Sequence, residues 1–234
     1  MTYTVVARCP DTRALGICLA TSPFGVASRC PHVRSNVAAI SSQSHSNWRL
    51  ALMGLDMVEN GLTGAEILKT LAAYDAHFAY RQVGIVPLTG PVAVHTGAKC
   101  GPWAGHKHGE DFITMGNGLV GPGVVEAMHD AFLDNAGQDF EERLLRTIEA
   151  GFGAGGEPIG QRSAGLIVAD ANAARPRTDL RIDKVAVPPE EGGDAVKELR
   201  ALFDSFKPLI PYYADFWLDH PEVGWKQWLA ERTA

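Results

Sequence analysis

The sequence lacks the features that mark membrane, secreted and nucleic-acid-binding proteins. No apolar stretch approaches the ~20 residues that a transmembrane helix requires. The amino terminus, MTYTVVARCP, has neither the basic start nor the apolar run of a signal peptide. There is no dense run of lysine and arginine, and the formal net charge of -6 does not favour contact with phosphates. We therefore expect a cytoplasmic protein whose partners include neither a membrane nor nucleic acid.

Cysteine is also scarce, which limits the metal and redox chemistry that the chain can carry. The cysteines are Cys9, Cys18, Cys30 and Cys100. They form no CxxC pair, so a zinc knuckle and a thioredoxin motif are excluded, and free, packed thiols are expected. His106 and His108 have a spacing that suits metal binding, but a metal site needs about three protein ligands. Without a further paired motif, we expect neither a metal nor a cofactor.

The chain does contain enough apolar material for one large domain. Of its 234 residues, 46% are hydrophobic and 21% are charged, as is usual for a globular protein. No tandem repeat, low-complexity segment or linker divides it. We expect residues 1–234 to form a single domain with an aromatic tail from about residue 207, which contains Trp217, Trp225 and Trp228.

The order of the expected elements favours an α+β fold. Apolar and β-branched runs predict strands at 3–8, 15–20, 37–42, 82–86, 92–96, 112–115, 164–169 and 180–187. Apolar periodicity predicts helices at 50–58, 63–74, 124–133, 140–151 and 190–206, and Thr63 and Glu66 have the spacing of a capping box. Because strands come in antiparallel groups and helices in pairs, we expect a four-layer αββα sandwich of two antiparallel sheets between helical layers.

The chain also resembles a known family. Its start, TYTVVAR, then a turn and LGICLATS, is similar to the opening hairpin of proteasome-type hydrolases, in which the residue heading the first strand is the nucleophile. To about Asp183, the chain resembles a bacterial family of uncharacterised proteins assigned to the N-terminal-nucleophile (Ntn) hydrolases. The stretches that carry this resemblance are YRQVGIV, HTGAKCGPWAGHKHGEDF, MGNGLVGPGVVEAM, ERLLRTIEAGFGAGGEPIGQRSAGLIV and DLRID. The resemblance implies a fold and a hydrolytic reaction class, and it names no substrate.

One glycine-rich turn departs from the pattern of that family. Where the pattern has GGD followed by RG, this chain has Glu157 and then Ile159-Gly160. An arginine that would contact a substrate carboxylate is therefore missing from the turn. Arg162, two positions after Gly160, is the candidate that replaces it.

Thr2 is the nucleophile that the resemblance implies. A threonine hydroxyl is a weak nucleophile unless a base takes its proton, and a free α-amine with a pKa of about 7.7–8.0 suits that task. Initiator methionine is readily removed before threonine, which would expose Thr2 without autoproteolysis, whereas Thr4 cannot be exposed in this way. The amine stays blocked while Met1 remains, and the alternative is an inert threonine near the start of a strand.

Several other positions are candidates to surround the nucleophile. By the same resemblance, Thr21 and Ser22 at the end of the second strand lie near it, and Arg34 supplies a cation that lowers its pKa. The segment SQSHSNW, with His45 and Asn47, contributes backbone N–H groups to an oxyanion hole. Each position also has a structural alternative. Thr21 and Ser22 could form a turn with exposed hydroxyls, Arg34 could be a surface arginine, and Asn47 could be a helix cap.

Later stretches supply the remaining candidates. In WAGHKHG, Trp103 is a candidate pocket wall, and His106 is either a proton carrier, a ligand contact or a hydrogen-bonded structural histidine. Asn117 is a candidate pocket amide. It lies in GNGLVG, whose letters fit the GxGxxG pattern, but a lone match of this kind is a weak indication of phosphate binding. Arg81 and Asp183 are either a structural ion pair or clamps on a ligand.

These patterns favour a hydrolase of a C–N bond in a small amide, ureido or cyclic imide compound. Thr2 would attack the carbonyl, its own amine would act as general base, and water would release the acyl-enzyme. The alternatives are a non-catalytic small-molecule binding or accessory protein of the same fold, and a hydrolase that uses His106 or a metal. Because aromatic residues are enriched at interfaces, the tail also predicts a homo-oligomer, with a tail packed on its own domain as the alternative.

Overall fold

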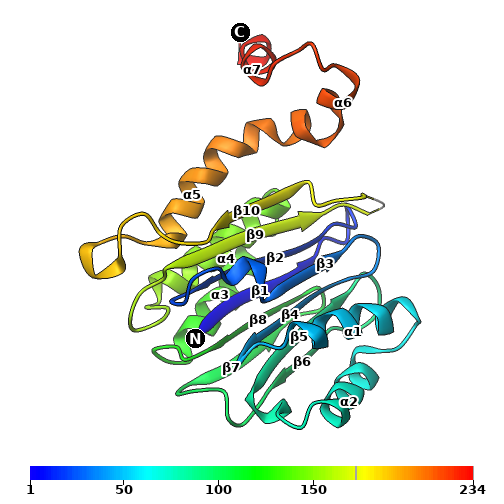
Figure 1. The fold of residues 1–234 in the computed structure, drawn as a ribbon, viewed down its shortest axis with the longest axis vertical. Coiled ribbons are helices and arrows are strands. Elements are labelled where there is room, and N and C mark those ends of the chain that lie inside the picture. The colour runs from blue at the N-terminus through cyan, green and yellow to red at the C-terminus, as the bar shows by residue number, and fades with distance from the viewer. Residues whose placement is uncertain (172, 234) are drawn as a thin grey trace.

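The computed structural model describes residues 1–171 and 173–233 and has a mixed α+β fold (Figure 1). The strands of the first sheet are β1 (Thr2–Arg8), β2 (Leu15–Thr21), β7 (Ala104–His108), β8 (Phe112–Asn117), β9 (Ser163–Ala169) and β10 (Thr178–Ile182). Those of the second sheet are β3 (Pro31–Arg34), β4 (Ala38–Ser44), β5 (Arg81–Pro87) and β6 (Ala93–Thr96). The helices are α1 (Trp48–Glu59), α2 (Gly64–Tyr74), α3 (Gly123–Asp134), α4 (Phe140–Gly153), α5 (Ala195–Phe206), α6 (Trp217–Asp219) and α7 (Trp225–Thr233). Short helical segments lie at Val26–Ser28, Phe78–Tyr80, Pro189–Glu191, Lys207–Leu209 and Tyr212–Phe216.

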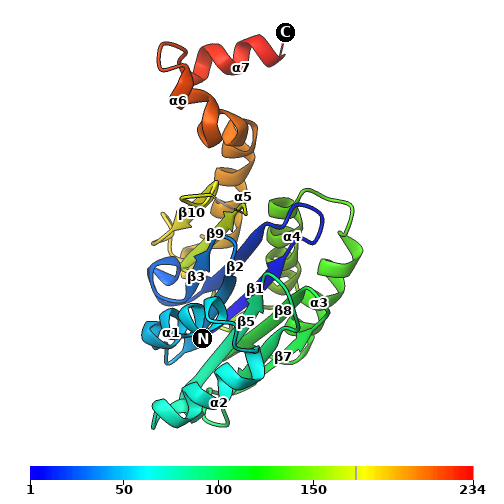
Figure 2. The ribbon, with the colours of Figure 1, turned by 90° about the vertical axis from the view of Figure 1, so that its right-hand side faces the viewer.

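Both sheets are antiparallel, and their strand orders are β10-β9-β2-β1-β8-β7 and β3-β4-β5-β6. This confirms the predicted α+β class with two antiparallel sheets. Val6, Ile17 and Met115 of the first sheet join Ala39 and Val86 of the second in one buried apolar cluster, so the sheets face each other. Helices α3 and α4 pack on the first sheet and α1 and α2 on the second (Figure 2). Strands such as β2 and β9 are thus buried on both faces, which explains their continuous apolar sequences.

Most helix boundaries follow the signals in the sequence. Thr63 and Glu66 form the capping box at the start of α2, and α1 ends directly before Asn60. Helix α5 is the exception, because it begins at Ala195 and not at residue 190 as predicted. Two glycines precede Asp194, whose side chain accepts hydrogen bonds from the N–H groups of residues 196 and 197 and caps the helix there.

The strand predictions missed two edge strands and extended a third too far. Strands β3 and β7 lie at sheet edges, where a strand pairs on one side only. The sequence of β3 begins with proline, and β7 reads AGHKH with mostly exposed side chains, so neither shows an apolar run. Strand β10 ends at Ile182 and not at residue 187, because the chain then turns back and Val185 N–H donates to Arg162 O at 2.8 Å.

The tail beyond α5 builds a small aromatic cluster of its own. Helix α5 packs on β9 and β10, and the chain then runs away from the sheets (Figure 1). The Trp228 ring is buried, with its centroid 5.6 Å from that of Tyr212 and 6.2 Å from that of Phe216. Trp217 and Trp225 are exposed. Within the described part of the chain, no helix combines the length and apolarity needed to cross a membrane.

Candidate functional site

Thr2 lies at the start of β1, in the interior of the first sheet. The register with β8 sets Thr2 opposite Asn117, and the register with β2, extended by one position, sets it opposite Thr21. The two hydroxyl oxygens, Thr2 Oγ1 and Thr21 Oγ1, are 3.3 Å apart, and Thr2 is only 4% exposed. Both hydroxyls donate to the carbonyl oxygen of Met1, that of Thr21 at 2.5 Å. Two donors therefore converge on one carbonyl oxygen beside the candidate nucleophile.

A chain of buried amides supports this end of β1. Asn117 Nδ2 donates to Gln82 Oε1 at 3.1 Å and lies 3.5 Å from the backbone oxygen of Thr2. Gln82 Nε2 faces two backbone carbonyl oxygens, which fixes the orientation of its amide. Gln82 Oε1 also accepts from Gln43 Nε2 at 2.8 Å. Because these amides are buried and partnered with one another, they hold the Thr2 end of β1 in a defined geometry.

Glu157 brings a buried carboxyl group to the same end of the strands. Its Oε2 accepts from the backbone N–H of Ser22 at 2.7 Å, and the residue is 3% exposed. Among the described residues, Glu157 Oε1 and the hydroxyls of Ser22 and Tyr3 are buried without a hydrogen-bond partner. Burial raises the pKa of Glu157 to about 7, against the lowering effects of hydrogen bonding at Ser22 and of the N-terminal ammonium. Buried polar atoms without partners are rare and usually mark a place for water or a ligand.

Met1 lies in front of these groups and is itself 39% exposed. Its side chain lies on Gly118, where φ is +65° and an added Cβ would come within 2.2 Å of Met1 Cγ. Glycine is therefore required at this position for both conformation and space. Leu119 N–H donates to the backbone oxygen of Trp103 at 3.3 Å, so Trp103 borders the same loop.

Three other predicted site residues gather around a different carboxylate, Asp75. Arg81 Nε donates to Asp75 Oδ2 at 2.9 Å, and Asn47 Nδ2 donates to the same oxygen at 3.2 Å. The backbone oxygen of His45 accepts from Arg81 Nη1. Burial alone would raise the pKa of Asp75. Hydrogen bonds from Arg81, the His77 N–H and Asn47 outweigh this effect and lower the pKa to about 2. The Asn47 side chain also caps α1, because its Oδ1 accepts from the backbone N–H of Arg49. It therefore has a structural role here.

His106 joins the outer end of the buried amide chain. Its Nδ1 lies 2.8 Å from Thr96 Oγ1, which also accepts from Gln82 Nε2 at 2.9 Å. Desolvation lowers the pKa of His106, with smaller contributions from the charges of His108 and His95. No three His, Cys, Asp or Glu side chains of the described residues are grouped so that they could hold a metal ion.

Arg162, Asp183 and Arg34 lie in separate places. Arg162 N–H donates to Thr21 O at 2.8 Å, while its guanidinium pairs with Glu190 at 2.8 Å. Asp183 is exposed just beyond β10, on a different sheet from Arg81. The expected role of Arg34 beside the nucleophile is wrong, because its register sets it at the far end of the sheets and it pairs there with two carboxylates of α1.

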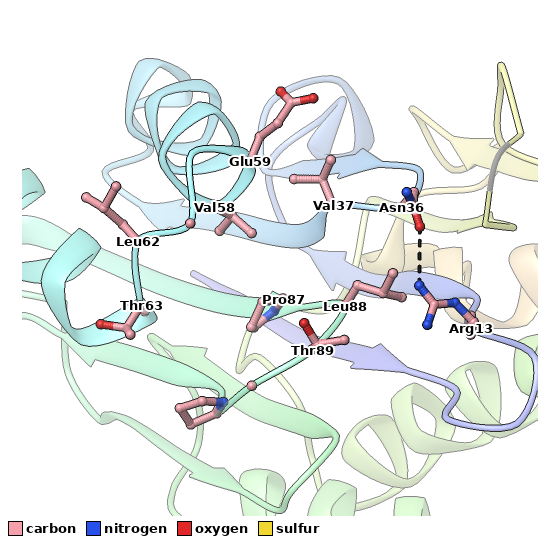
Figure 3. Close-up of a pocket in the computed structure, with 14 residues that line it drawn as sticks. Arg13, Asn36, Val37, Val58, Glu59, Leu62, Thr63, Pro87, Leu88 and Thr89 are labelled. Atoms are coloured by element: carbon pink, nitrogen blue, oxygen red, sulfur yellow. Dashed lines mark hydrogen bonds between the residues drawn. The ribbon is translucent and has the colours of Figure 1, made fainter.

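Open cavities lie at the other end of β1. One of about 520 Å³ is lined by Arg13, Asn36, Leu62 and Leu88 among others, with Arg13 Nη2 donating to Asn36 Oδ1 at 3.3 Å (Figure 3). Another of about 580 Å³ lies beside Arg8. Neither includes Thr2, in front of which Met1 is packed.

The model of a family of unknown function, DUF1028, matches residues 2–192. The chain belongs to this family. The matched segment contains Thr2, Thr21, Asn117 and Glu157 and ends before α5, so the aromatic tail lies outside it.

Solved structures support the fold of this family member. A crystal structure of a DUF1028 protein from Silicibacter pomeroyi superposes with a TM-score of 0.78, at 26% identity over 88% of each chain. Anbu (ancestral beta-subunit) from Yersinia bercovieri reaches a TM-score of 0.41 at 8% identity, over 91% of this chain and 97% of that chain, which is too low to bear on fold or function. A comparison with curated proteins gave no significant match.

The sequence does not single out the buried polar residues that support the candidate site. In the sequence, Glu157 stands out only as a departure from a family pattern. Gln82 falls in the strand predicted at 82–86, and Gln43 falls in the segment SQSHSNW after the strand predicted at 37–42. A usable signal was present, because an amide inside an apolar strand such as RQVGIV is costly to bury unless it is partnered.

Proposed function

We propose that the protein is an Ntn-type hydrolase of a C–N bond in a small amide, ureido or cyclic imide compound, with Thr2 as nucleophile once Met1 is removed. The observation that carries this proposal is the convergence of the Thr2 and Thr21 hydroxyls on one carbonyl oxygen at the head of β1. The two facing sheets with helices on their outer sides support the further proposal that the fold is the four-layer αββα sandwich of Ntn hydrolases.

The first half of the reaction forms an ester on Thr2. An ordinary α-amine has a pKa of about 7.7–8.0, so part of it is neutral at pH 7 and accepts the proton of the Thr2 hydroxyl. The hydroxyl oxygen bonds to the substrate carbonyl carbon, and the Thr21 hydroxyl, which donates to Met1 O in this structure, donates to the developing oxyanion. The ammonium returns the proton to the leaving nitrogen as the C–N bond breaks.

The second half uses water to restore Thr2. The amine takes a proton from water while the water oxygen attacks the ester carbonyl carbon. The bond between Thr2 Oγ1 and the acyl carbon then breaks, and Oγ1 regains a proton. One amide and one water thus give one acid and one amine or ammonia, while Asn117 and Gln82 keep the strand end in position.

Intact mass and turnover test this function together. The protein, made in a host with methionine aminopeptidase, is expected to lose Met1 and to hydrolyse a member of a panel of small amides, carbamoyl compounds and cyclic imides. Thr2→Ala, which also permits removal of Met1, should lower turnover by roughly 1,000-fold, and Thr2→Ser is the matched control that keeps a nucleophile. Quantitative retention of Met1 in the native host, or turnover by processed Thr2→Ala, would rule the mechanism out.

We further propose that the chain forms a homo-oligomer through its tail. Trp217, Leu218 and Trp225 are exposed there, and aromatic side chains of this kind are enriched at interfaces. Size-exclusion chromatography with light scattering tests the proposal, and a monomer at micromolar concentration would reject it.

A further inference from the structure

Met1 occupies the space beside Thr2 Oγ1 in which a substrate acyl group would lie. Its carbonyl oxygen accepts from the Thr2 and Thr21 hydroxyls, and its side chain lies on Gly118. The β1–β2 register, extended by two positions, sets Met1 opposite Ser22. The first residue of the chain therefore shows how an α-amino acyl group fits against this site.

The surroundings of the Met1 amine suit a positively charged group. Glu157 is anchored at the position opposite Met1, because its Oε2 accepts from Ser22 N–H. The N-terminal ammonium acts on this carboxyl group electrostatically, lowering the pKa that burial raises, although no direct ion pair joins them in the described structure. Glu157 Oε1 and the Ser22 hydroxyl are both buried, and neither has a hydrogen-bond partner of ordinary geometry, although the hydroxyl lies close enough to the carboxyl group to lower its pKa.

No cationic side chain of the described residues pairs with Glu157. The nearby Arg162 is paired with Glu190. Residue 159, where the family pattern has arginine, is an exposed isoleucine. A buried carboxylate without a partner is costly, and an ammonium that pairs with it makes a short, charge-assisted hydrogen bond.

We propose that, once Met1 is gone, its place receives the acyl part of a substrate that carries an α-ammonium group, held by Glu157 and Ser22. The inference rests on the proposed function of this site and narrows its substrates to small α-aminoacyl amides. An acyl group of this kind would present its carbonyl carbon to Thr2 and its side chain to Gly118, as Met1 does.

A binding experiment tests the inference without requiring turnover. Processed Thr2→Ala protein is titrated by calorimetry with L-methioninamide, which copies Met1, and with 4-(methylthio)butanamide, which lacks only the amine. We expect the amine-bearing probe to bind at least ~10-fold more tightly, because its ammonium pairs with a buried carboxylate. Glu157→Gln in the same background keeps an acceptor for Ser22 N–H and should reduce the difference to less than about 2-fold. Glu59→Gln, at an exposed carboxylate paired with Arg34, is the control that should change nothing.

The outcomes separate this inference from the proposed function. Equal binding of the two probes, no binding of either, or a preference that survives Glu157→Gln would overturn amine recognition. Thr2-dependent hydrolysis of amides without an α-amine would in that case leave the hydrolase proposal standing. If Glu157→Gln does not fold, Ser22→Ala takes its place, with an expected loss of about 3-fold or more in methioninamide affinity and no change for the probe without the amine.

Discussion

The two ends of β1 differ in whether their buried polar groups have hydrogen-bond partners. At the Arg8 end, the guanidinium donates to the Asp111 carboxylate at 2.7 Å and to the backbone oxygens of residues 87, 90 and 110. Cavities open beside these satisfied groups. At the Thr2 end, Met1 lies in front of Thr2, yet Glu157, Ser22 and Tyr3 each keep a buried polar atom without a partner.

The difference shows that an open cavity and a group of buried polar atoms without partners need not coincide. A buried polar atom without a partner costs about 1–3 kcal/mol, whereas a satisfied one is nearly neutral or stabilising. Several unpartnered polar atoms at the Thr2 end are explained if a ligand binds there. The polar groups at the Arg8 end are paired, and their role is to hold the surrounding turns in place.

Blocking the amine of Thr2 should have the largest effect. An uncleavable extension in front of Met1 leaves the Thr2 hydroxyl intact but removes its base, and general-base catalysis contributes roughly 1,000-fold in rate. We expect a loss of that size, measured as turnover of an amide that the processed protein hydrolyses. The same extension at the carboxyl end is the control, and full activity of the blocked protein would place the chemistry elsewhere.

Replacing Arg8 should lower stability and leave the Thr2 end unchanged. Arg8→Met removes the partner of the Asp111 carboxylate and of several backbone oxygens in a buried setting. We expect the free energy of unfolding to fall by about 3 kcal/mol, as measured by urea denaturation. Binding of L-methioninamide to processed Thr2→Ala protein should stay the same with and without Arg8→Met. A stability change under about 1 kcal/mol would contradict a structural role for this end.

Glu157 should make the protein less stable as pH rises toward neutrality. Burial raises the pKa of this carboxyl group from 4.5 to about 7, so between these values the folded state holds a proton that the unfolded state has lost. Unfolding then becomes easier as pH increases, by about 3 kcal/mol over the window. Urea denaturation at pH 4.5 and 7.5 measures this slope, and the difference from Glu157→Gln gives the part due to Glu157, because histidines with a lowered pKa such as His106 contribute equally to both proteins. Asp75, whose pKa is lowered to about 2, titrates below the window and does not interfere. Parallel slopes for the two proteins would show that Glu157 is not protonated in the folded state.

The fold was largely predictable because its signals are local. Apolar runs and caps such as Thr63 with Glu66 depend on neighbours in sequence, and the structure has them as predicted. Edge strands β3 and β7 were not predictable in this way, because a strand that pairs on one side and faces solvent needs no apolar pattern.

The site was predictable only where strand register decides it. Thr2, Thr21 and Asn117 come together because they are neighbours across paired strands, and Ser22 follows directly. Glu157 reaches them from a glycine-rich turn after α4, a contact that depends on how the helix layer packs on the sheet. Arg34 was misplaced for the same reason, since its position depends on a β3–β4 pairing that the sequence did not reveal.

Changes at Arg13 should give the smallest effects. They test whether the cavity at the Arg8 end of β1 is independent of the Thr2 end. Arg13 lines the cavity of about 520 Å³, is exposed, and has a φ of 59°, which favours glycine. Arg13→Gly also loses the exposed hydrogen bond to Asn36, but it relieves the left-handed backbone and should raise the free energy of unfolding by about 0.5 kcal/mol. Arg13→Ala keeps the strain, loses the hydrogen bond to Asn36, and should lower it by about as much. Urea denaturation measures both, and in the processed Thr2→Ala background neither change should alter methioninamide binding. If either did, the cavity would be coupled to the Thr2 site, and the two ends of β1 would have to be treated as parts of one functional surface.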